Sequence, residues 1–533
     1  MRVLGIEGTA WAASAALYDS RDGSVILESD PYTPDAGGIH PREAAEHMAS
    51  AIPTVIQRVL DAGGSDIDAV AFSQGPGLGP CLRIVATAAR TLAQRESVPL
   101  VGVNHMIAHL EVGRTLGGFD DPICLNASGA NAHVLGFHGD RYRVLGETMD
   151  TGVGNAIDKF TRHLGWSHPG GPRVEEKALD GDYLPLPYVV KGMDFSFAGI
   201  TSAAIEAIER GESIADVCFA LQETIFAMLT EVTERALSLT GRNEVVLGGG
   251  VGQNSRLQEM LSLMCAERGA TIYVPPDEYL RDNAAMIAML GETMHRAGDH
   301  LALEDSAVRS KYRPDQVPVS WREPSTRPLR IPQDNQQRGA EAIVRIVNGS
   351  VRKHRISKSY RHPVLDQSIR RERTATEARL LAGARKAGVP TPVIQDINLR
   401  DTELQMEHVG DTDLREHVTK DRVRAVGGLL ARIHAADIIH GDPTTRNIRI
   451  AEQSDGERLY LIDFGLGYYS GHIEDQAMDL HIFLQSLTEH AQEIKAFRPI
   501  LSAGYRDDAA GSNVDAAAVL TRLGEIDERG RYQ

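Results

Sequence analysis

Short apolar, β-rich runs alternate with longer segments in which apolar residues recur every three or four positions throughout residues 1–312. The short runs predict strands, and the longer segments predict helices with one buried face. The predicted strands are Val3–Ile6, Ala69–Ser73, Val245–Leu247 and Thr271–Val274. The predicted helices are Glu43–Ala62, Cys81–Gln94 and Ala215–Leu239. Strands and helices that alternate between Gly-bearing turns predict an α/β architecture of mostly parallel sheets covered by helices.

Two turns that lie far apart in the sequence are weakly similar. Gly8-Thr9 and Ser128-Gly129 each follow a strand-like run at the head of one half of this region. This similarity favours two related subdomains that face a common cleft.

Five prolines interrupt the pattern near the middle of the chain. They are Pro314, Pro318, Pro324, Pro328 and Pro332. Proline disfavours helices and cannot donate to a sheet ladder, so this stretch predicts an extended linker. The chain then divides into a domain at 1–312, a linker at 313–332 and a domain at 333–533, with a Pro-rich loop inside one domain as the alternative.

Composition narrows the class of protein. The 533 residues include 42% hydrophobic and 24% charged side chains, which is ordinary for a globular protein. No stretch approaches the ~20 apolar residues that span a bilayer, so no membrane partner is expected. The four cysteines are scattered and form no Cys-x-x-Cys pair, which favours buried thiols in a reducing compartment. We therefore expect a cytoplasmic protein.

Charge is distributed unevenly between the predicted domains. The net charge of −17 divides into −15 on residues 1–330 and −2 on residues 331–533. Residues 345–373 carry nine basic and two acidic side chains, and the end of the chain adds Arg529 and Arg531. A local field, rather than the net charge, steers a phosphate-bearing partner. These basic residues are candidates for phosphate contacts, with a solvated charged surface as the alternative.

Gly-bearing turns follow several strand-like runs. They lie within Gly5–Thr9, Asn126–Asn131, His168–Pro172 and Gly248–Asn254. Glycine lets backbone N–H groups approach a phosphate closely, although a single such turn is more often structural. Together the four turns favour a nucleotide cleft that is neither a P-loop nor a simple Rossmann site.

His105 and His109 stand four residues apart. On a helix this spacing places both imidazoles on one face, where they can share a metal ion, or where they simply pack. A zinc protease needs Glu directly after the first His, and Met106 occupies that position. Asp282 is a candidate third ligand, and a helix cap is its alternative role.

The motifs of residues 1–312 occur in an order that resembles one family. They are Gly5–Thr9, Ser73–Pro80, His105 with His109, Gly154–Lys159, His168–Pro172, Asp194–Gly199, Gly248–Asn254 and Asp282–Met286. The set is similar to that of the universal tRNA threonylcarbamoyladenosine transferases, which implies the two-lobed actin/Hsp70-like ATPase fold. The resemblance implies transfer of a threonylcarbamoyl group from threonylcarbamoyl-AMP to N6 of the adenosine beside the anticodon, in tRNAs that read codons beginning with A.

The same resemblance implies the site residues. One Fe(2+) per domain would be held by His105, His109 and Asp282. Threonylcarbamoyl-AMP would contact Asn126, Ala127, Ser128, Gly129, Ala130, Asp158, Gly171, Glu175 and Asn254. The family usually has Tyr where this chain has Asn126, so the last metal position stays open between Asn126 and water. The family's usual Lys after the Phe-Ser-Phe segment is also replaced, because Gly199–Ser202 follows here.

The second domain carries phosphoryl-transfer motifs. Asp442 and Asn447 lie within His440–Asn447, and Asp463 lies in an Asp-Phe-Gly segment. This spacing is typical of a kinase in which Asp442 is the catalytic base while Asn447 and Asp463 hold Mg(2+). Lys353, after the strand-like Ala342–Val351, and Glu377, on a helix, fit the ATP-binding ion pair.

The region 338–533 resembles the small atypical Ser/Thr kinase/ATPase of the KEOPS complex. The resemblance implies a small bilobal α+β domain, ATP with Mg(2+), other KEOPS subunits as partners, and an arrangement of fused domains seen in archaea. The family usually has Leu and Ser where this chain has Pro443 and Arg446.

The sequence therefore predicts a bifunctional tRNA-modifying enzyme whose second domain regulates the complex and contributes most of the tRNA affinity. Two alternatives stay open: a signalling Ser/Thr protein kinase with a regulatory ATPase-fold domain, and a metalloprotease with a kinase, which Met106 weakens.

Overall fold

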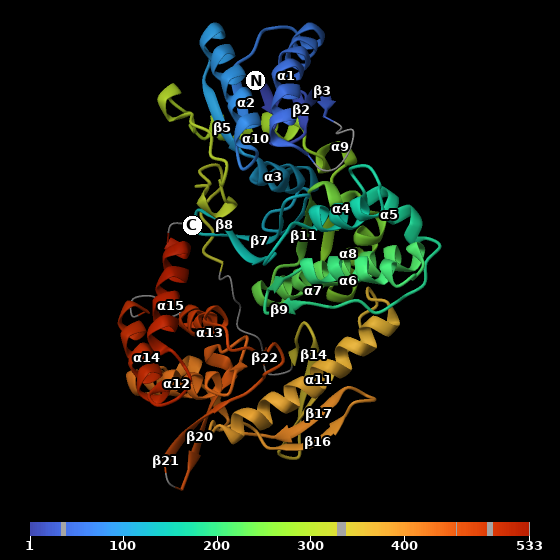
Figure 1. The fold of residues 1–533 in the computed structure, drawn as a ribbon. Helices are drawn as coiled ribbons and strands as arrows, with labels where there is room; N and C mark the ends of the chain where they lie inside the picture. Colours follow the sequence, from blue (N-terminus) through green and yellow to red (C-terminus); the bar gives the residue numbers. More distant parts are fainter. Residues whose placement is uncertain (33–38, 328–336, 455, 488–493, 532–533) are drawn as a thin grey trace. The chain divides into compact units, whose positions relative to one another are not determined.

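The computed structural model describes residues 1–32, 39–327, 337–454, 456–487 and 494–531. The chain forms two compact units (Figure 1). Unit 1 comprises Met1–Ile331 with Ser359–His362, and unit 2 comprises Pro332–Lys358 with Pro363–Gln533. None of the described helices combines the length and apolar character needed to cross a membrane.

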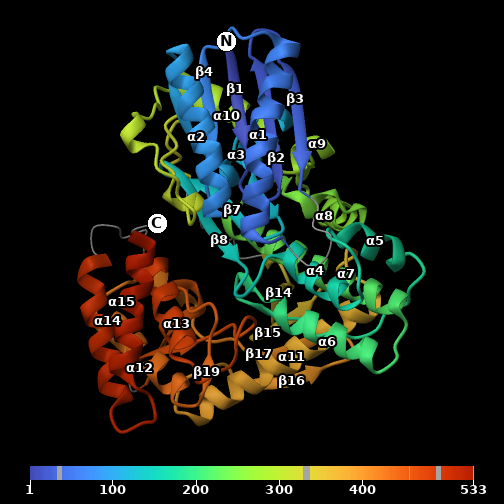
Figure 2. The same ribbon diagram turned by 45° about the horizontal axis from the view of Figure 1, so that its top comes forward.

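The first half of unit 1 is a five-stranded sheet with the order β3-β2-β1-β4-β5. Its strands are β1 (Arg2–Glu7), β2 (Ala12–Asp19), β3 (Ser24–Pro31), β4 (Ala69–Gly75) and β5 (Leu100–Asn104). Helices α1 (Pro41–Gly63) and α2 (Gly79–Glu96) cover one face, and α10 (Ala284–Arg296) packs against the other (Figure 2). Buried apolar residues of α1, such as Met48, Ile52 and Val55, point into this layer.

The second half of unit 1 repeats this plan with the order β12-β11-β6-β7-β8. Its strands are β6 (Ile123–Ala127), β7 (Ala132–His138), β8 (Arg141–Glu147), β11 (Glu244–Gly248) and β12 (Thr271–Tyr273). Its helices are α4 (Val153–His163), α5 (Gly171–Ala178), α6 (Ala198–Glu209), α7 (Ile214–Thr240) and α8 (Ser255–Arg268). Short elements complete it: β9 (Val190–Lys191), β10 (Asp194–Phe195), η1 (Gly250–Gln253) and α9 (Asp277–Leu280).

The two sheets share one topology. In each, the third, second, first, fourth and fifth strands of that half lie side by side in this order. Gly8-Thr9 and Ser128-Gly129, which are weakly similar, thus lie in the corresponding turns of two related subdomains, as predicted. The expectation of mostly parallel sheets is wrong, because each sheet has two parallel and two antiparallel strand pairs. The first three strands of each half are joined by short turns, which permit only antiparallel pairing.

A hydrophobic core lies between the two sheets of unit 1. It includes Val3, Val101 and Met286 from the first half, and Leu135 and Val246 from the second. Helix α3 (His105–Gly117) packs against β4 and β5 as well as β6 and β11, so it belongs to both halves. Side chains on α3 are therefore held at the junction of the subdomains.

The structure describes residues 313–327 of the predicted linker 313–332. Residues 313–327 belong to unit 1, where η3 (Pro314–Gln316), Val317 and Val319 are packed against the second sheet. Val319 N–H donates to the Asp140 carbonyl at 2.7 Å, and Ser325 pairs with Gly139. Residues 328–332 lie outside the described residues. The short η2 (Leu303–Asp305) precedes this segment.

Unit 2 has two lobes. The first is the sheet β13-β14-β15-β17-β16 with helix α11 (Pro363–Lys386). Its strands are β13 (Gln337–Arg338), β14 (Ala342–Val347), β15 (Ser350–Arg355), β16 (Ile394–Asn398) and β17 (Glu403–Glu407). The predicted strand Ala342–Val351 is instead the hairpin β14–β15, because Asn348 and Gly349 adopt positive φ angles of 51° and 74° and reverse the chain.

The second lobe is mainly helical. It contains α12 (Lys420–His434), α13 (Ile473–Ser486), α14 (Ile494–Ala509) and α15 (Ala516–Arg531). The lobe also contains short strands and turns: β18 (Thr412–Asp413), η4 (Leu414–Glu416), β19 (Ile438–Ile439), η5 (Thr445–Asn447), β20 (Ile448–Gln453), β21 (Gly456–Leu461) and β22 (Tyr468–Tyr469). The predicted class, a two-lobed α/β part followed by a small bilobal α+β part, is confirmed, as are the strands and helices predicted in 1–312.

Candidate functional site

Helix α3 carries the predicted histidine pair. Its N-cap is Asn104, whose side-chain oxygen accepts hydrogen bonds from Met106 N at 3.0 Å and Ile107 N at 3.1 Å. This cap starts the helix at His105, so His109 follows one turn later on the same face. The two rings are 4.9 Å apart at an angle of 87°.

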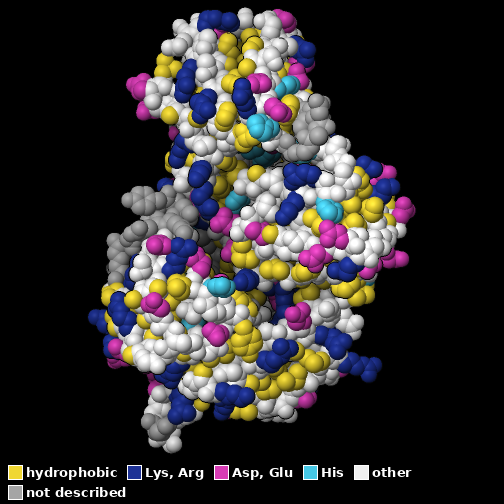
Figure 3. All heavy atoms as spheres, viewed as in Figure 1, with side chains coloured by type: hydrophobic (Ala, Val, Ile, Leu, Met, Phe, Trp, Pro, Cys, Tyr) yellow, Lys and Arg dark blue, Asp and Glu magenta, His cyan; other side chains and the backbone are white. Residues whose placement is uncertain are grey.

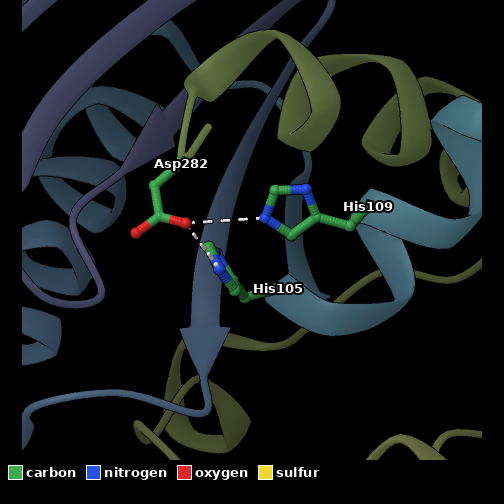
Figure 4. A group of neighbouring side chains, drawn as sticks. All are labelled: His105, His109 and Asp282. Atoms are coloured by element: carbon green, nitrogen blue, oxygen red, sulfur yellow. Dashed lines mark ion pairs between the residues drawn. The ribbon is translucent and has the colours of Figure 1, made fainter. Parts of the chain in front are cut away.

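Asp282 approaches the pair from the turn before α10 (Figure 4). Its Oδ1 lies 3.2 Å from His105 Nε2 and 3.5 Å from His109 Nε2. The capping role that was the alternative for Asp282 belongs to Asn283, whose side chain accepts a hydrogen bond from Met286 N at 3.0 Å. The Asp282 carboxylate is therefore directed at the histidines.

Glu7, at the end of β1, is a site residue that sequence analysis missed. Its Oε2 lies 3.0 Å from His105 Nδ1, and its Oε1 accepts a hydrogen bond from Thr9 N at 2.7 Å. A carboxylate on the far ring nitrogen fixes the orientation and tautomer of a metal-binding histidine. The signal available in the sequence was a charged residue directly after the apolar run Val3–Ile6.

These contacts determine the protonation of the metal-free site. Burial disfavours the charged form of His105, but the carboxylates of Glu7 and Asp282 outweigh it and raise the pKa of His105 to about 10. Burial works against the Asp282 carboxylate as well, yet the two histidines hold its pKa well below the usual range. The metal-free pair is thus a protonated imidazole beside an ionised carboxylate.

The donor set fits a metal ion. The ligand atoms of His105, His109 and Asp282 lie within 4.8 Å of one another. Within the part of the chain that the structure describes, the two buried ring nitrogens of His109 have no hydrogen-bond partner. The same holds for Asn126 Oδ1, which is buried at the end of β6. Buried polar atoms without partners are costly unless a ligand satisfies them, so two imidazoles and a carboxylate suit Fe, Zn or Mn.

The predicted substrate residues of the first turn lie around the start of α4. Asn126 and Ala127 end β6, and Ser128, Gly129 and Ala130 form the turn to β7. The Ser128 carbonyl accepts from Gly154 N at 3.1 Å, and the Gly129 carbonyl accepts from Asn155 N at 2.8 Å. This turn is therefore fastened to the N-terminus of α4.

Asp158 fastens the next Gly-bearing turn. Its Oδ1 accepts a hydrogen bond from Gly170 N at 2.8 Å, and its Oδ2 lies 3.0 Å from His168 Nδ1. Gly171 begins α5, and a side chain there would meet open space, so its backbone is accessible. Trp11, in the turn after β1, meets the His168 ring edge-on at 6.3 Å, which brings the two subdomains together at this turn.

Glu175 joins α5 to α8, and Asn254 joins the start of α8 to α7. Glu175 Oε1 accepts from Ser255 N at 2.8 Å and from Ser255 Oγ at 2.5 Å. Asn254 is the N-cap of α8, and its amide nitrogen donates to Gln222 Oε1 at 2.9 Å. Both side chains hold the fourth Gly-bearing turn in place.

The position of the family's usual Lys is filled differently. In the segment after Phe197, Thr201 is buried in α6, and its hydroxyl donates to the Phe197 carbonyl at 3.0 Å. Asp150 accepts hydrogen bonds from the backbone of Phe197 at 3.0 Å and Ala198 at 2.9 Å, which caps α6. Residues 197–202 therefore carry no cationic side chain, and the backbone N–H groups of Phe197 and Ala198 already donate to Asp150.

In unit 2 the predicted nucleotide-binding residues come together. Lys353 Nζ on β15 lies 2.7 Å from Glu377 Oε1 on α11 and 2.6 Å from Asp463 Oδ1. Burial opposes the charge of Lys353, but the two carboxylates raise its pKa. Burial also opposes ionisation of Asp463, and the Lys353 ammonium outweighs it and lowers the pKa of that carboxyl.

The turn that carries the predicted catalytic residue Asp442 is organised by a buried carboxylate. Asn447 Nδ2 donates to Asp442 Oδ2 at 3.1 Å and to the Asp442 carbonyl at 2.8 Å. Asp479 on α13 accepts from the backbone N–H groups of His440 at 2.7 Å and Gly441 at 2.9 Å. His434 on α12 lies 3.2 Å from the same carboxylate. Sequence analysis did not assign Asp479 this role.

The basic cluster at 345–373 is mostly internal. Of its nine Lys and Arg residues, Lys353, Arg355, Lys358 and Arg361 are buried, Arg370 and Arg373 are half-buried, and Arg345, Arg352 and Arg371 are exposed. On the face shown in Figure 3, Lys and Arg side chains are interspersed with Asp and Glu. The candidate phosphate contacts of this cluster are therefore reduced to three exposed arginines. The side chains of Arg529 and Arg531 lie outside the described residues.

The chain is similar to known proteins over its whole length. The family model for tRNA N6-adenosine threonylcarbamoyltransferase matches residues 23–289, and that of the lipopolysaccharide kinase (Kdo/WaaP) family matches residues 322–493. A protein of Haloquadratum walsbyi is 59% identical over 100% of both chains, and one of Halobacterium salinarum is 59% identical over 100% of this chain and 99% of its own. Each is described as a probable bifunctional tRNA threonylcarbamoyladenosine biosynthesis protein. Among solved structures, full-length HypF is 12% identical over 55% of each chain, with a TM-score of 0.41.

Proposed function

Because this chain belongs to the family of bifunctional tRNA threonylcarbamoyladenosine biosynthesis proteins, we propose a division of labour between its units. Unit 1 transfers the threonylcarbamoyl group from threonylcarbamoyl-AMP to N6 of the adenosine beside the anticodon, in tRNAs that read codons beginning with A. Unit 2 is an atypical Ser/Thr kinase/ATPase that regulates the complex. The observation that carries the first assignment is the cluster of His105, His109 and Asp282, in which the buried His109 nitrogens have no hydrogen-bond partner in the described residues.

His105, His109 and Asp282 are the residues that would hold one Fe(2+). When bound, such an ion would polarise oxygens of the mixed anhydride as a Lewis acid. Glu7 would orient His105 through its Nδ1. Asn126, with an unpartnered and buried Oδ1, or a water molecule in its place, would complete the site.

The Gly-bearing turns of the second subdomain would hold the AMP leaving group. The turn Asn126–Ala130 and the start of α5 at Gly171 present backbone groups near one another, because Asp158 and the start of α4 fasten both turns. Backbone N–H groups fixed in this way stabilise the negative charge that develops on a departing phosphate. Glu175 and Asn254 would act by holding the turn before α8 in place.

In unit 2, Asp442 would accept the proton of the attacking hydroxyl or water. Asn447 and Asp463 would hold Mg(2+), and Lys353, aligned by Glu377, would grip the ATP phosphates. The partners that we propose are tRNA, ATP and other KEOPS subunits, within the cytoplasm.

The experiment that tests the transferase combines the purified full chain, threonylcarbamoyl-AMP and unmodified tRNA, with and without KEOPS partners. Mass spectrometry of the digested tRNA should detect N6-threonylcarbamoyladenosine, and His105→Ala should abolish it. Absence of product even with partners present, or product that does not depend on His105, contradicts the proposal.

The alternative of a signalling kinase predicts the reverse pattern in cells. In that case Asp442→Ala abolishes function while His105→Ala is silent. Comparing the two variants in one strain therefore separates the two functions.

A further inference from the structure

A second charge cluster adjoins the nucleotide site of unit 2. Its centre is Glu341, in the turn between β13 and β14. Glu341 Oε2 lies 3.0 Å from Arg355 Nη1 on β15, and Glu341 Oε1 lies 2.9 Å from Arg373 Nη1 on α11. Each carboxylate oxygen thus faces a guanidinium group from a different element.

The same turn is fastened at two further points. Lys358 Nζ donates to the Ala340 carbonyl at 2.5 Å, and Ile356 N donates to the Glu341 carbonyl at 3.2 Å. Arg355 and Lys358 are each only 3% exposed. Removing one partner of a buried ion pair is strongly unfavourable, because the remaining charge is left uncompensated. The turn is therefore held in one position by charge as well as by the sheet.

Arg355 connects this turn with the lysine of the nucleotide site. Arg355 Nη2 lies 2.7 Å from Glu377 Oε2, while Lys353 Nζ lies 2.7 Å from Glu377 Oε1. One glutamate thus divides its two oxygens between Arg355 and Lys353. If Arg355 loses its ion pair with Glu341, more of its charge acts on Glu377. The alignment of Lys353, which shares Glu377, then changes as well.

The position of the turn in the fold explains why this matters. In ordinary kinases a Gly-rich segment at this place covers the nucleotide phosphates. Here Gly339 is followed by Ala340 and Glu341, so the turn has one glycine and several ion pairs.

We propose, on the basis of the proposed kinase function, that Glu341 is a positioning residue of the nucleotide site. Its carboxylate fastens the β13–β14 turn to Arg355 and Arg373 and, through Arg355, sets the Glu377–Lys353 pair.

The test uses the full chain with Glu341→Gln, which keeps the size of the side chain and removes its charge. The kcat of ATP hydrolysis, per nucleotide-binding site, should fall about tenfold. The Kd of a fluorescent ATP analogue should stay unchanged or become tighter, because Arg355 and Arg373 are less neutralised. Glu341→Asp, which restores the charge, should recover roughly half of the lost rate. A merely structural role would lower the Tm and the number of binding sites, and leave kcat per site unchanged.

Glu372→Gln is the matched control, since Glu372 is an exposed glutamate on α11 beside Arg373. A kcat for E341Q within about twofold of the E372Q value overturns the positioning role alone. If the unaltered chain neither binds nor hydrolyses ATP, the proposed kinase function is overturned and the positioning role with it. If E341Q fails to fold, Arg373→Gln takes its place, because it removes one ion pair of Glu341 and keeps the Glu341–Arg355 pair. The kcat of this variant is expected to fall about threefold, and an unchanged kcat overturns the role.

Discussion

The sites of the two units balance charge in opposite ways. In unit 1, the carboxylates of Glu7 and Asp282 surround two histidines, so the site is negative whenever the imidazoles are neutral. In unit 2, three carboxylates face three cations: Glu341, Glu377 and Asp463 against Lys353, Arg355 and Arg373. The first arrangement attracts a free divalent cation, whereas in the second these carboxylates are already paired with cations and attract one less strongly.

This difference in charge bears on how each site would bind the metal ion proposed for it. Unit 1 offers His109 nitrogens without hydrogen-bond partners in the described residues and an anionic setting, so the proposed ion would bind there as a resident group. In unit 2, Lys353 is already paired with Asp463, so we expect the proposed Mg(2+) to bind together with the phosphates that draw Lys353 away. We therefore expect substitutions in one site to change its metal or nucleotide behaviour without changing the other.

The largest effect is expected from Asp282→Asn. This change keeps the shape of the side chain and removes the charge between the two histidines. Metal affinity should fall at least ~100-fold, because loss of an outer-shell partner already costs 10–100-fold. Metal analysis of the purified full chain measures it, and ATP hydrolysis serves as the control. Retained metal together with lost ATP hydrolysis would contradict the separation of the sites.

Asp442→Asn should produce the complementary result. Loss of the general base is expected to lower kcat for ATP by about 10²–10⁴-fold, while Kd for ATP stays within about twofold because Lys353 and Glu377 are untouched. Steady-state phosphate release and nucleotide titration measure the two quantities. The metal content of unit 1 should not change, and a parallel loss of metal would show that the units are not independent.

The motifs indicated which side chains lie together in each unit, but not the contacts that hold them. His105, His109 and Asp282 could be grouped because an i, i+4 helical pair and a turn before a helix are both local patterns. Glu7 and Asp479 could not be assigned in this way. Each acts through a backbone or ring nitrogen of a distant element, and sequence spacing does not reveal such a contact.

The sheets show the same limit. Strand positions followed from apolar runs, whereas strand direction depended on turns such as Ser128–Asn131, which were interpreted as ligand loops and not also as antiparallel connections. The basic residues at 345–373 were grouped by sequence, but burial separates Arg355 from Arg352 although both belong to β15. Alternation along a strand decided that outcome.

The pH dependence of metal uptake offers a finer comparison. With a pKa of about 10 against an ordinary 6.5, His105 in the metal-free chain must lose a proton before it binds metal. Metal affinity, measured by chelator competition, should rise about tenfold per pH unit from about pH 7 to about pH 9. Protonated His105 stabilises the metal-free fold fully below pH 6.5, and this contribution is lost as pH rises through 10.

Glu7→Gln sharpens this prediction, because it removes one of the two carboxylates that raise the pKa of His105. The rise in metal affinity should then level off at a lower pH than in the unaltered chain. An identical pH profile in both proteins would mean that Glu7 does not set the protonation of His105. Nucleotide affinity of unit 2 should show no matching shift and serves as the internal reference.

The smallest effect is expected from the exposed arginines of unit 2. The combined change of Arg345, Arg352 and Arg371 to Gln removes the three basic side chains of the cluster that face solvent. If they contact tRNA phosphates, the slope of log affinity against log salt should decrease by up to about 2–3, at ~0.7–0.9 per contact. Filter binding across a salt series measures the slope.

The matched control replaces three exposed arginines of unit 1, Arg21, Arg42 and Arg58, with Gln. Because unit 1 carries most of the negative charge, its isolated arginines lie in a field that repels phosphate, and the slope should stay unchanged. An equal loss of slope from the unit 1 variant would contradict the prediction that unit 2 contributes most of the tRNA affinity. A loss confined to the unit 2 variant would place tRNA contacts on the lobe that carries Lys353, because Arg345, Arg352 and Arg371 lie on β14, β15 and α11.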